Sequence, residues 1–415
     1  MKESEYNIEV MSNQNYRIIY NSLSKSIVKL SQDININSLK NDDDYTYKTL
    51  LDNGIILENN SIREIDKIEF LYRKSFFDSD QLNIILTPTF DCNLTCPYCF
   101  EASNRSIAQC NDYYDSILKF AKKYFKSYRY VNISLFGGEP LIEFDKLDIL
   151  LNKIKYMSDK YNFIFGTSIT TNGTLINKKI LDKLVNYNCK TIQITLDGSK
   201  ETHDTTRKFK NGLGSFDKLI NIINEVMYQY IDKKKFKFIL RVNLNNNTVE
   251  EISDALSGVD KRLRKNISLV LRPVYNTDSY NKINSNNFSE IRTFYEAGSS
   301  LGYSIMKNNY FYRSCEACGD ENFFYITPDL NVRKCINNMS FNNAKIGRLT
   351  EDGDYVVDLD KVTAWYKAAD CFSDSKCRKC KILPDCLGGC ILYKSLNEER
   401  KCSDFNLVSL PYFYE

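Results

Sequence analysis

The distribution of cysteine constrains this 415-residue chain more than any other feature. Fourteen cysteines are present; none precedes Cys92, and nine lie between Cys315 and Cys402. The start, MKESEYNIEV, lacks a basic segment followed by an apolar one, and no apolar run reaches the roughly 18 residues that span a bilayer. We therefore expect a cytoplasmic protein without a membrane partner. Thiols stay reduced there, so metal ligation explains the cysteines better than disulfides do.

Charge and histidine content exclude several classes of protein. Lys and Arg number 56 against 53 Asp and Glu, a formal charge of +3, so we expect no nucleic-acid partner. His203 is the only histidine, which argues against zinc sites built on several histidines and against a Ser-His-Asp hydrolase. Thiolate-rich sites favour zinc or iron-sulfur clusters. Cys110 and Cys189 stand apart from the other cysteines and are most simply free core thiols.

Between residues 80 and 300, short apolar runs alternate with longer amphipathic segments, which predicts an α/β fold with a parallel sheet. Polar or glycine-bearing motifs such as DCNLTCPYC and GGEP follow most of the runs. Because the carboxyl ends of the strands carry the chemistry in βα barrels, we expect these motifs to meet in one site. The predicted strands are 82–88, 131–136, 165–171, 191–196, 236–244 and 267–274.

The chain divides into three predicted domains. Residues 1–79 contain no cysteine and resemble a small α+β unit, with YRIIYN and SIVKL as a hairpin and YTYKTLLDNG as a helix that ends at a glycine. Residues 80–300 form the βα core. Residues 301–415 are rich in Cys, Gly and turn residues, so we expect a loop-rich domain that metal ligation stabilises.

Three cysteines, Cys92, Cys96 and Cys99, follow the first predicted strand with the spacing CxxxCxxC. Three thiolates can hold three irons of a [4Fe-4S] cluster and leave the fourth iron open, whereas the plainer alternatives are a zinc knuckle or buried free thiols. The loop resembles that of the radical SAM superfamily. The resemblance implies a partial (β/α)6 barrel and a cluster whose open iron binds S-adenosyl-L-methionine (SAM).

Further motifs resemble the sulfatase-maturase and peptide-maturase branch of this superfamily. There the GGEP turn presents backbone groups to the SAM ammonium. In this chain Thr195 precedes the string LDGSKETHDTTR and Arg207 ends it, and in that branch the corresponding hydroxyl residue and arginine contact SAM. Arg241, Asn243 and Asn172 are further candidates for contact with SAM or the substrate, and each could simply be a polar strand-end residue. His203 is either structural or catalytic. No catalytic residue is assigned. The resemblance implies SAM binding by Gly137, Gly138, Glu139, Thr195 and Arg207, and Arg241 and Asn243 complete the list of candidate cofactor-binding residues.

The later cysteines resemble the SPASM domain, an extension of radical SAM enzymes that binds two auxiliary [4Fe-4S] clusters. In the family the ligands of the two clusters interleave along the chain. The resemblance therefore assigns Cys315, Cys318, Cys335 and Cys390 to the first cluster, and Cys377, Cys380, Cys386 and Cys402 to the second.

Three points about these ligands stay open. Two four-thiolate zinc sites would use the same cysteines but supply no electrons. Cys371 could replace Cys315 as a ligand. The family usually has glycine five residues before the cysteine equivalent to Cys335, and Leu330 stands there, which we interpret as a local change of turn.

The resemblance implies a radical SAM enzyme with three [4Fe-4S] clusters, in which a 5′-deoxyadenosyl radical abstracts a substrate hydrogen. SPASM proteins mostly modify peptides, so the expected function is maturation of a ribosomally made peptide by a thioether or C-C crosslink. Expected partners are the precursor peptide and a low-potential electron donor such as flavodoxin or ferredoxin. One alternative is an anaerobic sulfatase maturase that forms formylglycine, although Ile336 stands where that family has a catalytic Asp. Another is a noncatalytic iron-sulfur electron carrier.

Residues 1–79 have two alternative roles. The edge formed by YRIIYN and SIVKL could add the leader of the precursor as a further strand, or the domain could only cap the barrel. In the first case, deletion of residues 1–75 spares iron content and weakens precursor binding.

Overall fold

The computed structural model describes residues 1–36, 39, 45–58, 62–77, 80–244, 247–273, 288–305, 319–336 and 342–397. Their contacts divide the chain into two compact units. One comprises Met1–Asp78, Lys307–Glu321 and Thr363–Glu415, and the other comprises Ser79–Met306 and Asn322–Val362. Within the described ranges, no helix is both long and apolar enough to cross a membrane.

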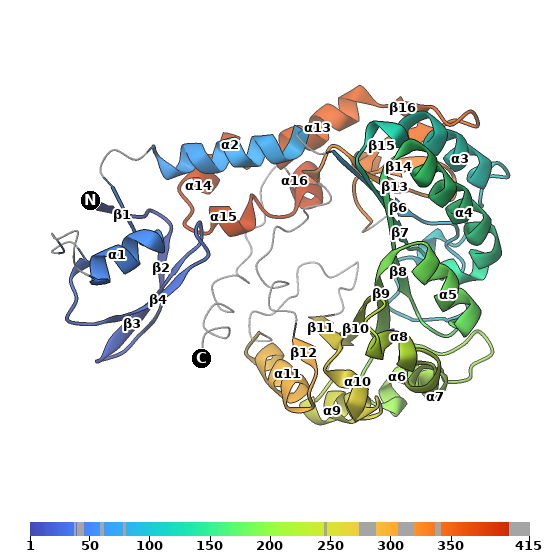
Figure 1. Ribbon diagram of the computed structural model, residues 1–415, viewed down its shortest axis with the longest axis horizontal. Helices are drawn as coiled ribbons and strands as arrows, with labels where there is room; N and C mark the ends of the chain where they lie inside the picture. The colour runs from blue at the N-terminus through green and yellow to red at the C-terminus, as the bar shows by residue number, and fades with distance from the viewer. Residues whose placement is uncertain are drawn as a thin grey trace. The chain divides into compact units, whose positions relative to one another are not determined.

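The unit that contains residues 79–306 is built on an eleven-stranded sheet (Figure 1). Strands β6 to β11 follow one another in chain order and are parallel, and β12 continues this run at one edge. On the other side β13 pairs in parallel with β6, and β14 to β16 form an antiparallel extension. The strands are β6 (Gln81–Leu86), β7 (Tyr130–Leu135), β8 (Ile164–Thr171), β9 (Cys189–Leu196), β10 (Lys237–Leu244), β11 (Ile267–Pro273), β12 (Ser304–Ile305), β13 (Phe323–Ile326), β14 (Asn331–Arg333), β15 (Lys345–Leu349) and β16 (Tyr355–Val357).

The six predicted strands are all present, and their ends lie within two residues of the prediction where the structure describes them. The predicted α/β class and parallel sheet are thus confirmed. The sequence did not predict that residues 323–357, from the cysteine-rich region, would extend the same sheet. These strands are short and separated by turns, so their periodicity carries little signal.

The two faces of the parallel strands differ in polarity. In β9, Ile192, Ile194 and Leu196 lie in the hydrophobic core, and in β10 the same holds for Phe238 and Leu240. The intervening residues include Gln193, Thr195, Arg241 and Asn243, which point to the opposite face because successive side chains of a strand alternate. A parallel sheet covered by helices on both faces would be apolar throughout. This polar face, called the inner face below, is therefore the one suited to a ligand.

Helices follow the strands and cover the apolar face, as Figure 1 shows for α3, α4 and α5. Local signals fix several ends: Asn177 caps the start of α5, and Thr248 and Glu251 form a capping box at α9. The helices of this unit are α3 (Tyr113–Tyr124), α4 (Phe144–Tyr161), α5 (Lys178–Asn186), α6 (Lys200–Thr206), α7 (Phe216–Asn221), the π-helical turn Ile222–Val226, α8 (Tyr228–Asp232), α9 (Val249–Ser257), α10 (Lys261–Arg264) and α11 (Phe288–Ser300).

The other unit combines the start of the chain with the last described cysteines. Its sheet has the order β2-β3-β4 and is antiparallel. Tyr72 donates a hydrogen bond to the carbonyl of Ala369 at 2.6 Å, and its ring packs on Phe372. Its elements are β1 (Lys2–Glu3), β2 (Asn7–Ser12), β3 (Tyr16–Asn21), β4 (Ile27–Ser31), α1 (Tyr45–Asp52), β5 (Ile56–Leu57), α2 (Glu64–Phe77), most of α13 (Leu359–Ala369), α14 (Ser375–Arg378), α15 (Leu383–Cys386) and α16 (Ile391–Asn397).

The predicted hairpin and helix of residues 1–79 are present, but one inference about them is wrong. The segment YRIIYN is β3, the central strand, and it pairs with β2 on one side and β4 on the other. Both of its ladders are occupied, so it cannot supply an edge for a peptide. Of the two predicted strands, only β4, which contains most of SIVKL, lies at an edge of this sheet.

Candidate functional site

The cysteine loop begins at the carboxyl end of β6, where the predicted site lies. Its backbone is fastened to the segment that follows α6: the Thr95 amide donates to the carbonyl of Lys208 at 2.9 Å, and Leu94 forms a β-bridge with Phe209. Within the loop, the Cys99 amide donates to the carbonyl of Cys96 at 3.2 Å. Because Arg207 directly precedes Lys208, the loop and the predicted SAM-binding arginine are held together.

Two amides point at the sulfur of Cys92. The Leu94 backbone amide lies 3.4 Å from Cys92 Sγ, and the side-chain amide of Asn172 lies 3.6 Å away. Such donors favour a thiolate over a thiol. Burial acts the other way and raises the pKa of Cys92 and Cys99, and that of Cys96 to about 11. A metal that binds here must therefore displace protons.

No disulfide joins two of the cysteines that the structure describes. Across the described residues, no three Cys, His, Asp or Glu side chains converge closely enough to hold a single metal ion. The thiolates of a [4Fe-4S] cluster bind separate iron corners, so they need not meet at one point. The donor set of the loop is three sulfurs without a histidine, and amides support the sulfur of Cys92, which is the composition of an iron-sulfur site.

The GGEP turn follows β7 and packs directly on the start of the cysteine loop. A methyl group on Gly138 would lie 2.1 Å from the carbonyl oxygen of Asp91, and Gly137 has φ +120. The amides of Gly138 and Glu139 donate to the carbonyls of Thr89 and Asp91, at 3.1 and 2.8 Å. These glycines thus allow close approach to the protein backbone, whereas the resemblance explained them by close approach to SAM.

The Glu139 side chain is fully buried and already occupied. It accepts hydrogen bonds from the amides of Leu141 and Asn172 and from the Thr171 hydroxyl, at 2.7 to 3.0 Å. Burial raises the pKa of this carboxyl group, which these donors partly offset. The carboxylate therefore joins the turn to the end of β8, and only the backbone of Glu139 remains as a candidate for SAM.

A buried polar network lies beside Cys96. The Tyr98 hydroxyl donates to Asp197 and accepts from Arg207 Nη1 at 3.0 Å and from Asn243 Nδ2 at 3.3 Å. Burial alone would lower the pKa of Arg207, but Tyr98 and Asp197 more than offset this and raise it. Arg207 is thus a buried charged residue at the site and not a surface charge.

Two atoms of this network have no hydrogen-bond partner among the described residues. They are Nε of Arg207, a donor, and Oδ1 of Asp197, an acceptor, and both are buried. The two side chains approach within 3.9 Å. Leaving such atoms unpaired costs free energy, so the pair suits a bound ligand that presents both acceptors and donors. A SAM molecule, with its carboxylate and hydroxyl groups, meets this description.

The other predicted residues fall into two groups. Thr195 and Arg241 are neighbours in register on the inner face, and Arg241 Nε donates to Asn243 at 2.9 Å. His203 is instead fully buried in the fold, where its ring contacts the amide of Asp197 and the Ser215 hydroxyl. Burial lowers the pKa of His203 to about 3, so it is a neutral structural residue.

The later cysteines are only partly described. Of the eight predicted ligands, Cys315, Cys318 and Cys402 lie outside the described residues. Cys377 lies in α14, and the amide of Cys380, just after this helix, donates to the carbonyl of Cys377. The turn after Cys386, the last residue of α15, uses the left-handed backbone of Leu387, Gly388 and Gly389. Cys371 lies in a hydrophobic cluster against which Cys377 and Cys380 pack.

Leu330 shows why the family has glycine at this position. Its φ of +61 is left-handed, a conformation that costs roughly 1–2 kcal/mol for a residue with a Cβ. Leu330 lies in the turn between β13 and β14 and is buried in the core, and this packing offsets the strain. The change of turn relative to the family remains a prediction.

Sequence reasoning missed the roles of two residues. Tyr98 lies between two cysteines of the motif, so its position next to the site could have been inferred. Asp197 precedes Gly198 in the string that led to Arg207, but nothing in the string indicates that its carboxylate is buried beside the arginine. Of the two isolated cysteines, Cys189 is confirmed as a core thiol, and Cys110 packs against the core from a partly exposed position.

Comparison with known proteins agrees with this geometry. Residues 86–257 match the model of the radical SAM superfamily. The cysteine-type anaerobic sulfatase-maturating enzyme of Clostridium perfringens is 29% identical over 41% of this chain and 54% of its own length. The mycofactocin maturase MftC of Mycobacterium ulcerans is 31% identical over 31% of each chain. The chain spans about half the length, or less, of the sequence relatives it matches.

Two solved structures share the fold. Native anSMEcpe with bound AdoMet and Cp18Cys peptide has a TM-score of 0.54 and 20% identity, covering 80% of this chain and 95% of that one. Streptococcus suis SuiB bound to S-adenosylmethionine also has a TM-score of 0.54, with 18% identity over 96% and 97% of the two chains. At these identities the likeness concerns the fold alone.

Proposed function

The chain belongs to the radical SAM superfamily, and from this membership we propose that it matures a ribosomally made peptide by installing a thioether or C-C crosslink. The observation that carries the proposal is the buried network beside the cysteine loop, in which Arg207 and Asp197 retain unpaired atoms. A noncatalytic electron carrier would have no use for such atoms, so the network favours an enzyme over that alternative.

Cys92, Cys96 and Cys99 would hold a [4Fe-4S] cluster, and Arg207, Asp197 and Thr195 would bind SAM. When bound, the cluster and SAM supply a 5′-deoxyadenosyl radical that abstracts a substrate hydrogen. The protein's own residues position the cysteines and SAM and exclude water from them. Asn172 and the Leu94 amide orient Cys92, and the Glu139 carboxylate fixes the turn beneath the loop. Arg207 is suited to the SAM carboxylate by its planar set of donors.

The proposal includes two auxiliary [4Fe-4S] clusters with the interleaved ligands that the SPASM resemblance assigns. Two of the ligands, Cys377 and Cys380, lie on one short segment whose backbone turns back on itself. In the alternative, the same cysteines form four-thiolate zinc sites, which supply no electrons. Metal analysis therefore distinguishes zinc sites from iron-sulfur clusters.

A peptide substrate is supported by the relatives that share the fold. The solved structures include SuiB bound to precursor peptide SuiA and anSMEcpe bound to a peptide. Sulfatase maturation is the second candidate, favoured by the likeness to the Clostridium perfringens enzyme. Ile336 still counts against it, because an aliphatic side chain cannot take up the proton that the family's aspartate would. Flavodoxin or ferredoxin as electron donor, and a cytoplasmic, anaerobic setting, complete the proposal.

Anaerobic reconstitution tests the proposal directly. We expect about 12 irons per chain and release of 5′-deoxyadenosine from SAM after reduction. Cys92→Ala with Cys96→Ala and Cys99→Ala should remove about a third of the iron and all SAM cleavage. Cys110→Ala is the matched control and should change neither. Unchanged iron in the triple variant, or four-thiolate zinc in the wild type, would contradict the cluster assignment.

A further inference from the structure

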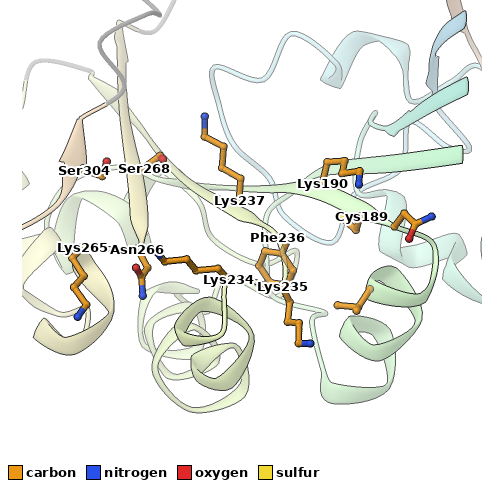
Figure 2. Close-up of a pocket in the computed structure, with 12 residues that line it drawn as sticks. Cys189, Lys190, Lys234, Lys235, Phe236, Lys237, Lys265, Asn266, Ser268 and Ser304 are labelled. Atoms are coloured by element: carbon orange, nitrogen blue, oxygen red, sulfur yellow. The ribbon is translucent and has the colours of Figure 1, made fainter. Parts of the chain in front are cut away.

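A pocket of about 670 Å³ lies at the amino ends of strands β9 to β12, the end of the sheet opposite the cysteine loop (Figure 2). Five lysines line it: Lys190, Lys234, Lys235, Lys237 and Lys265. We call this group the lysine pocket. All five side chains are exposed, and none forms an ion pair with another described residue.

No carboxylate of the described residues lies within 4.0 Å of an amino group of the lysine pocket. Asp182 accepts a hydrogen bond from the Tyr230 hydroxyl, and Asp260 pairs with Arg262. Five positive charges in one region form a positive surface that attracts anionic groups, while water and salt screen their mutual repulsion. For the chain as a whole the formal charge is only +3, so this concentration is local.

Two of the five lysines lie on the inner face of the sheet. Every second residue of a strand points to the same face, so Lys237 shares the inner face of β10 with Ile239 and Arg241. Lys190 also lies there, because a Cβ on Gly166 would be 3.8 Å from its Cε and 2.9 Å from Oδ1 of Asn132. The inner face continues from these lysines to Arg241 and Asn243, which contact the network beside the cysteine loop.

The lysines do not converge on one point. In Figure 2, Lys237 extends to one side of the strand ends, whereas Lys235 and Lys265 extend to the other. A single phosphate could contact only some of them. An extended chain with several carboxylates could contact most of them in turn.

We infer that the lysine pocket binds an acidic segment of the peptide substrate at the end of the barrel opposite the radical SAM site. The inference rests on the proposed function. From Lys237 to Asn243 the strand rises about 20 Å, a distance that roughly six residues of extended peptide span. The acidic segment therefore lies about six residues from the residue that is modified. An acidic redox protein fits the charge equally well, but at this end its electron would have to cross the whole height of the sheet.

The test uses the reconstituted full-length chain and a labelled peptide of five Glu-Gly repeats. The pocket variant is Lys190→Glu, Lys234→Glu and Lys237→Glu, and the matched control is Lys122→Glu, Lys153→Glu and Lys179→Glu, three exposed lysines on α3, α4 and α5. Both variants change the net charge by the same amount. In fluorescence anisotropy at fixed salt, we expect the pocket variant to bind the peptide at least tenfold more weakly than the control variant, and a Gln-Gly peptide not to bind. A photo-crosslinker in the Glu-Gly peptide should label residues 234–237.

Equal affinity of the pocket and control variants, or crosslinks confined to other segments, would overturn the inference. So would flavodoxin binding that the pocket variant loses while the Glu-Gly peptide is unaffected, because the pocket would then serve a redox protein. A Lys→Gln triple variant covers the case in which charge reversal unfolds the chain. SAM cleavage without substrate is measured in parallel: its absence in the wild type defeats the proposed function but leaves the binding result interpretable.

Discussion

The polar side chains around the cysteine loop are held by partners from several strand ends. Asn172 at the end of β8 contacts Cys92, and Asn243 on β10 contacts Tyr98 of the loop itself. Each hydrogen bond to a neutral group contributes only about 1 kcal/mol, but an unpaired buried group costs more. A ligand that pairs the two unpaired atoms, Nε of Arg207 and Oδ1 of Asp197, should therefore gain more binding free energy there than at the other residues of the network.

Arg207→Ala should weaken SAM binding about 10- to 100-fold, equal to roughly 1.4 to 2.8 kcal/mol, because a charge-assisted hydrogen bond is lost. Equilibrium binding of SAM to the reconstituted protein measures this. Arg262→Ala, which removes an exposed arginine paired with Asp260, should leave SAM binding unchanged. If the two variants bind SAM alike while iron content stays intact, Arg207 does not contact SAM.

His203 gives the fold a specific sensitivity to acid. Burial lowers its pKa to about 3 from 6.5 in the unfolded chain, so below pH 6.5 the unfolded state binds the extra proton. The stability that the neutral ring contributes is therefore complete above pH 6.5 and is lost as the pH falls toward 3. Between pH 7.5 and 5 the loss should be about 2 kcal/mol. Denaturant titrations should show that His203→Gln has a smaller pH dependence over this range; an identical slope would contradict the assignment.

At the scale of elements, the sequence predicts most of what periodicity and motif spacing can encode. Strands β6 to β11 have regular apolar alternation and strong turn signals, and all six were found. The position of the cysteine loop followed from its place after β6. The joining of β13 to β6 could not be predicted, because a pairing between strands more than 230 residues apart leaves no local pattern. The packing of the GGEP turn on the cysteine loop could not be predicted either, since spacing does not say which backbone a glycine approaches, and its contact with SAM remains a prediction.

Gly138→Ala should separate the GGEP turn from the cysteine loop. The added methyl would lie 2.1 Å from the carbonyl oxygen of Asp91 and 2.4 Å from that of Phe90, and backbone atoms cannot yield cheaply. We expect a loss of stability of about 2 kcal/mol or more and less iron in the loop's cluster. Gly258→Ala is the matched control, because its nearest contact, at 3.3 Å, is milder and its φ is helical. Similar iron contents in both variants would contradict the role of Gly138.

At the scale of the whole molecule, the three predicted domains and the two compact units comprise different residue ranges. The start of the chain packs with the last described cysteines in one unit: Tyr6, Ile65, Ile68 and Tyr72 share a hydrophobic cluster with Cys371, Phe372 and Leu383. Asp385, one residue before Cys386, is buried and accepts from Tyr20 at 2.9 Å. The three-domain division remains a prediction about independent folding, and these contacts make residues 1–79 a structural support for the later cysteines.

Deletion of residues 1–75 should therefore lower the iron bound through Cys377, Cys380 and Cys386, in contrast to the expectation from sequence that iron content is spared. The deletion removes four buried side chains from the shared cluster, each worth about 1.5 to 3 kcal/mol. The cluster at Cys92 should persist, since its loop belongs to the other unit, and SAM cleavage without substrate should continue. Two point variants on α2 sharpen the test: Ile68→Ser, which is buried, should lower iron content, whereas Leu71→Ser, which is 59% exposed, should not. If both the deletion and Ile68→Ser retain full iron while precursor binding falls, the first residues act in leader binding and not as a support for the cysteines.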